Sequence, residues 1–171
     1  MVIWLVGMYA SGKTTLAREI HNIFETENKK VLILNGGEIR QILGSDLNYS
    51  INDRKINAER LSRLCNFLGE QGTIVICAVL SIFEETRAWN RNNIKDYYEV
   101  FVDVSIKTLL QRDVKNLYRK ALNGEIDNFV GVDIEFTRPA NPDLVVNNNL
   151  TRESLSDLAA MVVESIRKRS R

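Results

Sequence analysis

The sequence predicts an α/β fold in which a parallel sheet of about five strands carries helices on both faces. Short apolar runs rich in β-branched residues alternate along the chain with stretches of helical periodicity. Strands that are covered on both faces need such runs, and right-handed crossovers place the intervening helices on both sides of the sheet. Ligands bind such sheets at the carboxyl ends of the strands, so the residues that follow each strand are the first candidates for function.

Each expected strand is followed by one expected helix. The strands are predicted at residues 2–6, 31–34, 73–79, 99–104 and 144–146. The helices are predicted at residues 13–27, 53–71, 84–95, 106–118 and 152–169. A length of 171 residues fits one domain, 1–171. Residues 115–142 match neither pattern, and a segment of this length is typical of a functional element such as a mobile lid or of disorder. Its scattered aromatic and apolar residues favour the lid, because they could cover a bound ligand.

Composition argues against several classes of protein. A net charge of +1 gives no general field for nucleic acid. No apolar run approaches the length of a membrane span, and the first run is too short for a signal peptide, so a soluble cytoplasmic protein is expected. Cys65 and Cys77 lie in apolar patterns and are predicted to be buried thiols. With His21 as the one histidine, we expect neither a histidine-based metal cluster nor a Ser-His-Asp triad.

The strongest motif is GMYASGKT at residues 7–14. It matches G-x-x-x-x-G-K-[ST], follows the first predicted strand and opens the first predicted helix, which is the context that a phosphate-binding loop (P-loop) requires. Successive backbone N–H groups and the helix N-terminus attract an anion there. Lys13 is expected to reach the β- and γ-phosphates of ATP, and Thr14 to offer its hydroxyl to Mg²⁺. The residues expected to bind ATP in this loop are Gly7, Tyr9, Ala10, Ser11, Gly12, Lys13, Thr14 and Thr15.

A small-molecule kinase fits the remaining features better than a GTPase or a hydrolytic ATPase. No Asn-Lys-x-Asp follows a late strand, and the third predicted strand ends without an aspartate. A kinase needs the phosphate loop, an acceptor pocket and a lid that excludes water. Arg54 and Asn57 share a face of one predicted helix and, with Arg40, form a candidate cationic patch near the strand ends. Each of these residues taken alone is more typical of a solvated surface.

The chain as a whole resembles the adenylylsulfate kinase family, whose members transfer the γ-phosphate of ATP to the ribose 3′-hydroxyl of adenylyl sulfate. The similarity runs from Gly7 to Val146, and its most specific segment is RDVKNLYRKALNGEIDNFVGVD at 112–133, which is similar to the family's lid. The later RPANPDLVV at 138–146 matches the run into the family's last strand. The resemblance implies a P-loop kinase fold, ATP and Mg²⁺ as cofactors and a nucleotide acceptor. Family members often pair, which makes a homodimer an open expectation.

The same resemblance implies which residues bind the acceptor and the lid side of ATP. The implied acceptor residues are Arg40, Tyr49, Arg54, Asn57, Leu80, Ser81, Lys115 and Phe129. Among them, Tyr49 and Phe129 occupy the positions of two aromatic residues that sandwich the acceptor base, where stacking contributes about 1–3 kcal/mol per base. Arg112 is implied to lie against the ATP adenine. The implied lid residues are Lys115, Leu117, Tyr118 and Lys120.

The chain departs from the family at the end of its second predicted strand. The family carries Asp-Gly-Asp there, whereas this chain has Asn35, Gly36 and Gly37, so the carboxylate near the metal's water shell and the one near the attacking hydroxyl are both absent. In the lid, Asp127 and Val130 replace a lysine and a threonine. The exchange of lysine for aspartate reverses a charge close to the expected acceptor.

Three hypotheses account for these departures. The protein is a kinase for another nucleotide, such as cytidine diphosphoramidate, the acceptor of a related kinase type in capsule modification. Alternatively, it is an adenylylsulfate kinase that uses a substitute carboxylate, for which Glu38 is the nearest candidate. The expected catalytic residues are then Lys13, Arg40 and Glu38. In the third hypothesis it binds nucleotides as a regulator. Positioning and charge dominate phosphoryl transfer, and losing a general base costs about 10²–10⁴-fold, so catalysis is the expectation.

Overall fold

A five-stranded parallel sheet organises the chain, and the computed structural model describes residues 1–44, 46–149 and 155–169. The strand order is β2-β3-β1-β4-β5, and all four pairings are parallel. The strands are β1 (Val2–Val6), β2 (Val31–Asn35), β3 (Ile74–Val79), β4 (Tyr97–Asp103) and β5 (Leu144–Asn147). The predicted sheet is therefore confirmed, with strand ends that differ by one or two residues.

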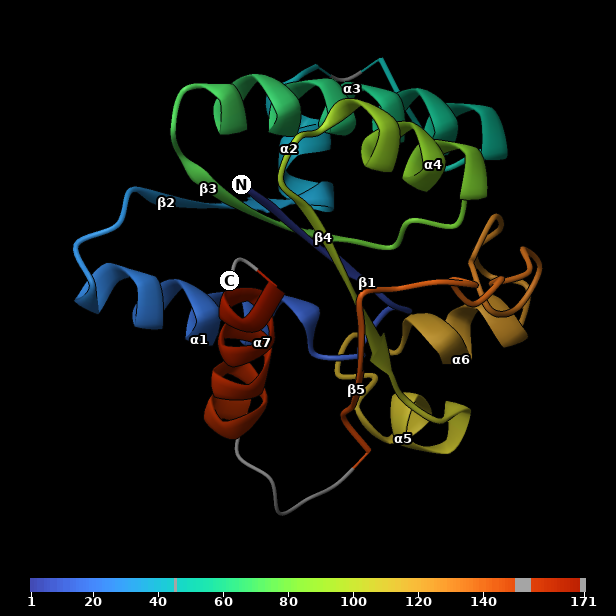
Figure 1. Cartoon of the computed structure of the whole chain (residues 1–171). Coiled ribbons are helices and arrows are strands. Elements are labelled where there is room, and N and C mark those ends of the chain that lie inside the picture. Colours follow the sequence, from blue (N-terminus) through green and yellow to red (C-terminus); the bar gives the residue numbers. More distant parts are fainter. Residues whose placement is uncertain (45, 150–154, 170–171) are drawn as a thin grey trace.

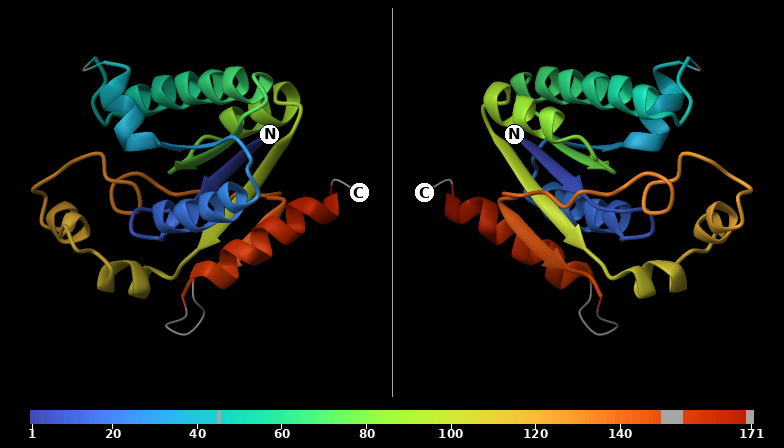
Figure 2. Two further views of the ribbon diagram at one scale, coloured as in Figure 1. Left: turned by 90° about the vertical axis from the view of Figure 1, so that its left-hand side faces the viewer. Right: turned by 90° about the vertical axis from the view of Figure 1, so that its right-hand side faces the viewer.

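Helices cover both faces of the sheet (Figures 1 and 2). The long helices are α1 (Lys13–Thr26) and α7 (Leu155–Arg169) on one face, and α3 (Ile51–Glu70) and α4 (Glu84–Asn93) on the other. Two apolar clusters result because successive strand residues point to opposite faces. In β1, Ile3 and Leu5 pack with α1 and α7, whereas Val2, Trp4 and Val6 pack on the α3 side.

Three helices differ from the sequence expectation. The helix predicted at 106–118 is two helices, α5 (Ile106–Gln111) and α6 (Leu117–Leu122). The break arises because the Asp113 carboxylate accepts hydrogen bonds from the backbone N–H groups of Leu117 at 2.8 Å and Tyr118 at 2.7 Å, which starts a new helix. The short helix α2 (Gly36–Ile42) was not expected, since its Gly-Gly start gives no helical signal.

The last helix and the cysteines agree with expectation within the described residues. Helix α7 is described from Leu155 to Arg169, and residues 152–154 of the expected helix lie outside the described ranges. Cys65 and Cys77 are both buried free thiols. Among the helices in the described ranges, none combines the length and the apolar character needed to cross a bilayer.

The expected lid at 115–142 lies at the end of the sheet where the strands terminate (Figure 1). Its first element is α6, and a loop follows. In this loop the Asp133 carboxylate accepts hydrogen bonds from the backbone N–H groups of Asn128 and Phe129, and an isolated β-bridge joins Val130 to Ile134. The segment is thus a folded loop with local hydrogen bonds, positioned next to the P-loop.

Packing of α7 against the sheet predicts a contrast between two residues of that helix. Leu158 is 2% exposed, whereas Met161 is 44% exposed. Leu158→Ala is expected to lower the free energy of unfolding by about 2–5 kcal/mol, because it leaves a cavity in the core. Met161→Ala is the matched control and should change it by less than about 1 kcal/mol. Urea unfolding measures both, and equal losses would contradict the described packing.

Candidate active site

The turn between β1 and α1 has a geometry that only glycine permits at two positions. Gly12 caps α1 with a φ of +89°, and a Cβ there would lie 2.5 Å from the Asn148 side chain. A Cβ on Gly7 would lie 2.9 Å from the backbone oxygen of Val102. Ala10 adopts a φ of +62°. The chain therefore curls tightly over residues 7–14, as the motif predicts.

Lys13 folds back over this loop. Its Nζ donates to the backbone oxygen of Met8 at 2.7 Å and to Ser11 Oγ at 3.2 Å. Burial lowers the pKa of Lys13 to about 7, because the ammonium is removed from water. Both of its acceptors are neutral oxygens, so a phosphate that entered the loop would provide the negative charge that favours the protonated amine.

Asn148 links this loop to Arg112. Its side-chain nitrogen donates to the Ser11 backbone oxygen at 2.8 Å, and its own backbone oxygen accepts from Arg112 Nη1 at 2.8 Å. Arg112, the residue expected at the ATP adenine, is therefore connected to the phosphate loop through one buried asparagine. Sequence reasoning missed Asn148 because it belongs to no motif. Its position directly after β5 could have identified it, because ligands bind parallel sheets at the carboxyl ends of the strands.

The Asn-Gly-Gly segment lies next to the P-loop. Asn35 Nδ2 donates to Thr14 Oγ1 at 3.1 Å, and Asn35 Oδ1 accepts from the backbone N–H of Gly37 at 3.0 Å. The oxygen is therefore committed to capping α2 and the amide nitrogen faces Thr14. Where the family has a carboxylate, this chain presents a neutral hydrogen-bond donor.

Thr14 fits the expected role toward Mg²⁺. A Mg²⁺ ion in a kinase is usually held by one or two protein oxygens together with phosphate oxygens and water. The hydroxyl of Thr14 lies at the start of α1, and one of its lone pairs stays available after it accepts the Asn35 hydrogen bond. Within the described ranges, no three His, Cys, Asp or Glu side chains cluster in a way that would hold the ion without a phosphate.

The acceptor-side arginines converge on one aromatic ring. The guanidinium groups of Arg40 and Arg54 lie over the Tyr49 ring, at 4.9 and 5.4 Å from its centroid. Arg54 also donates to the backbone oxygens of Tyr49 at 2.9 Å and of Asn128 in the lid at 2.7 Å. Asn57, one turn along α3 from Arg54, is 5% exposed, and its Oδ1 is buried without a hydrogen-bond partner. The structure thus brings Arg40 and Arg54 together at Tyr49, and Asn57 lies one helical turn from Arg54 with a buried oxygen that has no hydrogen-bond partner.

The second predicted stacking residue has other ring partners. Phe129 is 9% exposed and packs edge-on against Tyr118 at 4.9 Å and Tyr9 at 6.1 Å between centroids. The Tyr118 hydroxyl donates to the Tyr9 backbone oxygen at 3.2 Å. Tyr49 instead contacts the two guanidinium groups described above. The lid is therefore packed against the P-loop through three aromatic rings.

The remaining predicted site residues differ in how exposed they are to solvent. Leu80 and Ser81 follow β3, whose last residue is in register with the end of β1, and Ser81 is buried. Glu38 is exposed in the first turn of α2. The exposed residues also include Thr15, Lys115 and Lys120, whereas Leu117 is half-buried against the core.

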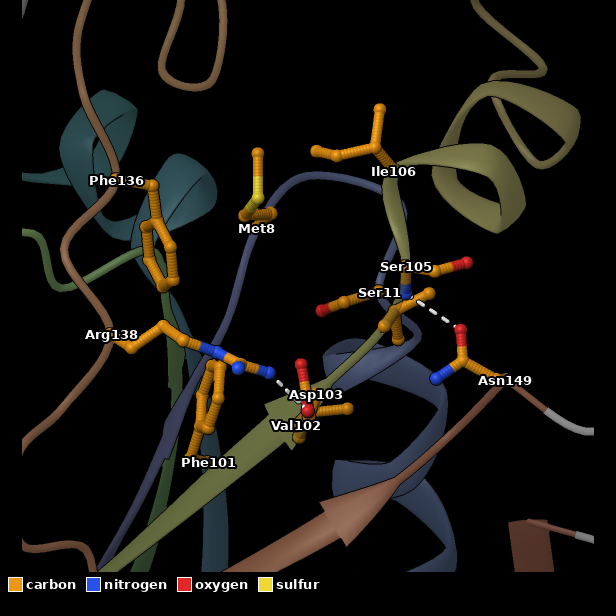
Figure 3. A pocket seen from close by; sticks show the side chains of 11 residues that line it. Met8, Ser11, Phe101, Val102, Asp103, Ser105, Ile106, Phe136, Arg138 and Asn149 are labelled. Carbon is orange, nitrogen blue, oxygen red and sulfur yellow. Dashed lines mark hydrogen bonds and ion pairs between the residues drawn. The ribbon is translucent and has the colours of Figure 1, made fainter.

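A pocket of about 360 Å³ adjoins the P-loop beside Met8 and Ser11 (Figure 3). In Figure 3, Arg138 from the end of the lid points toward Asp103 at the end of β4, with which it forms an ion pair. The Phe101 and Phe136 rings lie on the same side of the pocket as Arg138 and stack with centroids 6.1 Å apart. Sequence reasoning did not name this pocket, although Asp103 ends β4 and Val104 and Ser105 follow it at the carboxyl edge of the sheet.

The site combines a curled loop that contains a partly buried lysine, a threonine at the helix start, a cationic patch and a lid. These features define a P-loop kinase, a phosphotransferase with a hydroxyl group as acceptor. Comparison with known proteins narrows this class. The family model for adenylylsulphate kinase matches residues 1–147. The chain belongs to the adenylylsulphate kinase family.

Individual relatives fall into two groups by name. The chain is 39% identical over 165 residues to a cytidine diphosphoramidate kinase of Campylobacter jejuni, covering 96% of this chain and 95% of that protein. It is 39% identical over 155 residues to an adenylyl-sulfate kinase of Bacillus pumilus, covering 89% and 79%. Among solved structures, the Mycobacterium tuberculosis APS kinase in complex with AMPPNP and APS matches with a TM-score of 0.90 and 32% identity, covering 97% of this chain and 96% of that one.

Burial of Lys13 predicts proton uptake when ATP binds. At pH 8.5 the amine is mostly neutral, because its pKa is about 7, and a neighbouring triphosphate raises that pKa. Binding should therefore take up close to one proton, and affinity for ATP should fall as the pH rises above about 7. Calorimetry in buffers of different ionisation enthalpy measures the uptake. Lys13→Met should remove it, and a heat that is independent of the buffer in the unaltered protein would contradict the described burial.

Proposed function

We propose that the protein transfers the γ-phosphate of ATP to the ribose 3′-hydroxyl of a small nucleotide whose 5′-phosphate carries a compact anionic or polar substituent. The observation that carries this proposal is the pairing of two anion-binding regions at one edge of the sheet. One is the P-loop with the partly buried Lys13, and the other is the Arg40–Arg54–Tyr49 cluster beside the unpartnered Asn57 oxygen. AMPPNP and APS together in the tuberculosis kinase structure support two nucleotide subsites.

The ATP side is proposed to work through charge and position. Backbone N–H groups of residues 7–14 and the α1 N-terminus hold the β- and γ-phosphates, and Lys13 neutralises charge on the group in transfer. Mg²⁺, when bound, neutralises further phosphate charge, and Thr14 is the residue proposed to hold it. Arg112 is proposed to lie against the adenine, in the place where Asn148 ties it to the loop.

The acceptor side is proposed to orient the nucleotide. Arg40 and Arg54 bind its anionic group, and the buried Oδ1 of Asn57 accepts a hydrogen bond from an N–H or O–H group of the nucleotide. Tyr49 and Phe129 stack on its base, which requires Phe129 to turn from Tyr9 and Tyr118 toward the acceptor. Leu80, Ser81 and Lys115 complete the acceptor side, and the lid excludes water.

Two acceptors are favoured by specific observations. Adenylyl sulfate is favoured by the family and by the APS in the tuberculosis structure. Cytidine diphosphoramidate is favoured by the Campylobacter relative, which this chain covers over 95% of its length. The neutral Asn35–Gly37 segment and Asp127 add weight to an altered acceptor, because both change the charge that the acceptor meets.

A single-turnover assay with labelled ATP against a panel of nucleotide acceptors tests this function. We expect transfer to adenylyl sulfate or to cytidine diphosphoramidate, and none to nucleosides that lack the 5′ group. Lys13→Ala should abolish transfer while the fold is kept, with Lys29→Ala, an exposed lysine, as the matched control. Binding of ATP without transfer to any acceptor would support the regulator hypothesis instead.

Glu38 is proposed as the substitute carboxylate for the two aspartates that the chain lacks. It lies three residues after Asn35, whose amide contacts Thr14, and it is exposed in the first turn of α2. Glu38→Gln should lower kcat by at least about tenfold with KM for ATP unchanged, because removal of a general base typically costs about 10²–10⁴-fold. The matched control is Glu25→Gln on α1. A loss smaller than tenfold rejects the role of Glu38.

A further inference from the structure

The chain turns sharply where β3 ends. Ser81 is buried and has a φ of +53°, a left-handed conformation that is strained for any residue with a Cβ. Such residues keep this conformation only where their surroundings hold it, and they gather at functional sites. The turn lies at the edge of the sheet beside the P-loop, because β3 pairs with β1 and Val79 is opposite Val6.

Two buried hydrogen bonds hold this serine, one through its side chain and one through its backbone. Trp4 Nε1 donates to Ser81 Oγ at 3.0 Å, and Arg87 Nη1 donates to the Ser81 backbone oxygen at 2.6 Å. Trp4 is fully buried in β1, three residues before the P-loop begins. Arg87 belongs to α4, the helix that follows the turn. The turn is thus anchored both to the strand that carries the P-loop and to the next helix.

Arg87 is a buried cation with a buried partner. Its side chain and that of Glu99 on β4 are each 2% exposed, and Arg87 Nε lies 3.8 Å from Glu99 Oε1. Arg87 also pairs with the exposed Glu84, and Glu99 accepts from the Tyr97 hydroxyl at 2.8 Å. A buried ion pair seldom stabilises a fold more than apolar residues of similar size would. Stability alone therefore does not explain the buried Arg87–Glu99 pair. An arginine has five N–H donors in a rigid fork, which lets one group bind Glu99 and Ser81 together.

We propose that Arg87 is a positioning residue of the kinase site. Oriented by Glu99, it holds the backbone of Ser81 in the left-handed conformation and thereby fixes the acceptor-side turn relative to the P-loop. The inference rests on the proposed function, in which Leu80 and Ser81 lie beside the acceptor. Arg87 acts only through Ser81, so its loss should change acceptor binding and leave ATP binding unchanged.

Arg87→Lys tests this role. The variant keeps a positive charge near Glu99. A lysine ammonium lacks the wide planar fork of donors of an arginine, so it does not bind Glu99 and the Ser81 oxygen at the same time. The matched control is Arg91→Lys: Arg91 also lies near Glu99, at 3.7 Å, but donates to Asn141 and Asp143. If Arg87→Lys does not fold, the double variant Arg87→Met with Glu99→Gln leaves no unpaired buried carboxylate, and Glu99→Gln alone is its control.

The first readout does not depend on any acceptor. The chain has two tryptophans, so the indole N–H of Trp4 is resolved from that of Trp89 by NMR. In Arg87→Lys the Trp4 signal should shift and exchange with solvent at least about tenfold faster, because Ser81 leaves its position; in Arg91→Lys it should not change. A folded Arg87 variant with an unaltered Trp4 signal overturns the proposal, even if the protein phosphorylates no acceptor in the panel and the proposed function itself fails.

The second readout separates positioning from general destabilisation. With the acceptor that the panel identifies, KM for the acceptor should rise by about tenfold or more in the Arg87 variants, while KM for ATP stays within about twofold. Arg91→Lys should change neither constant. Equal increases in both constants, or none, would make Arg87 a structural residue only and overturn the proposal.

Discussion

A partly buried ammonium held by neutral oxygens is the interaction on which the site depends. Lys13 Nζ contacts the Met8 carbonyl and the Ser11 hydroxyl, and burial keeps its pKa near 7. The fold maintains this arrangement by curling the backbone through Gly7 and Gly12, where a side chain would collide with Val102 or Asn148. A triphosphate completes the arrangement electrostatically, because it supplies the charge that the protein's own groups around Lys13 do not provide.

The other parts of the site are arranged around this cation. Asn35 reaches Thr14 from the end of β2, Asn148 reaches Ser11 from the end of β5, and the Phe129 ring rests on Tyr9. Three strand ends and the lid therefore meet at one loop, as parallel sheets of this kind allow. The replacement of a carboxylate by the Asn35 amide makes the surroundings of Thr14 less negative than in a family member with aspartate there. This difference lies on the ATP side of the site, beside the residue proposed to hold Mg²⁺.

Much of the fold and part of the site could be predicted from the sequence. The P-loop was found because its spacing is nearly unique and its position after an apolar strand is obligatory. Arg40 and Arg54 were predicted as part of a cationic patch from their positions in the sequence, and the family resemblance added Tyr49. The two guanidinium groups do converge on the Tyr49 ring. The break between α5 and α6 was missed, since it depends on one carboxylate, Asp113, that binds two backbone N–H groups. Asn148 was missed because a single asparagine after a strand carries no pattern, and the contact of Phe129 with Tyr9 joins residues far apart in the sequence.

The most direct test of this account is a crystal structure with a non-hydrolysable ATP analogue. The account predicts that the β- and γ-phosphates lie within hydrogen-bond distance of Lys13 Nζ and of the backbone N–H groups at the start of α1, with Lys13 released from the Met8 oxygen. A triphosphate bound elsewhere, with Lys13 still folded onto Met8, would contradict the central claim that this loop is built around the phosphates of ATP.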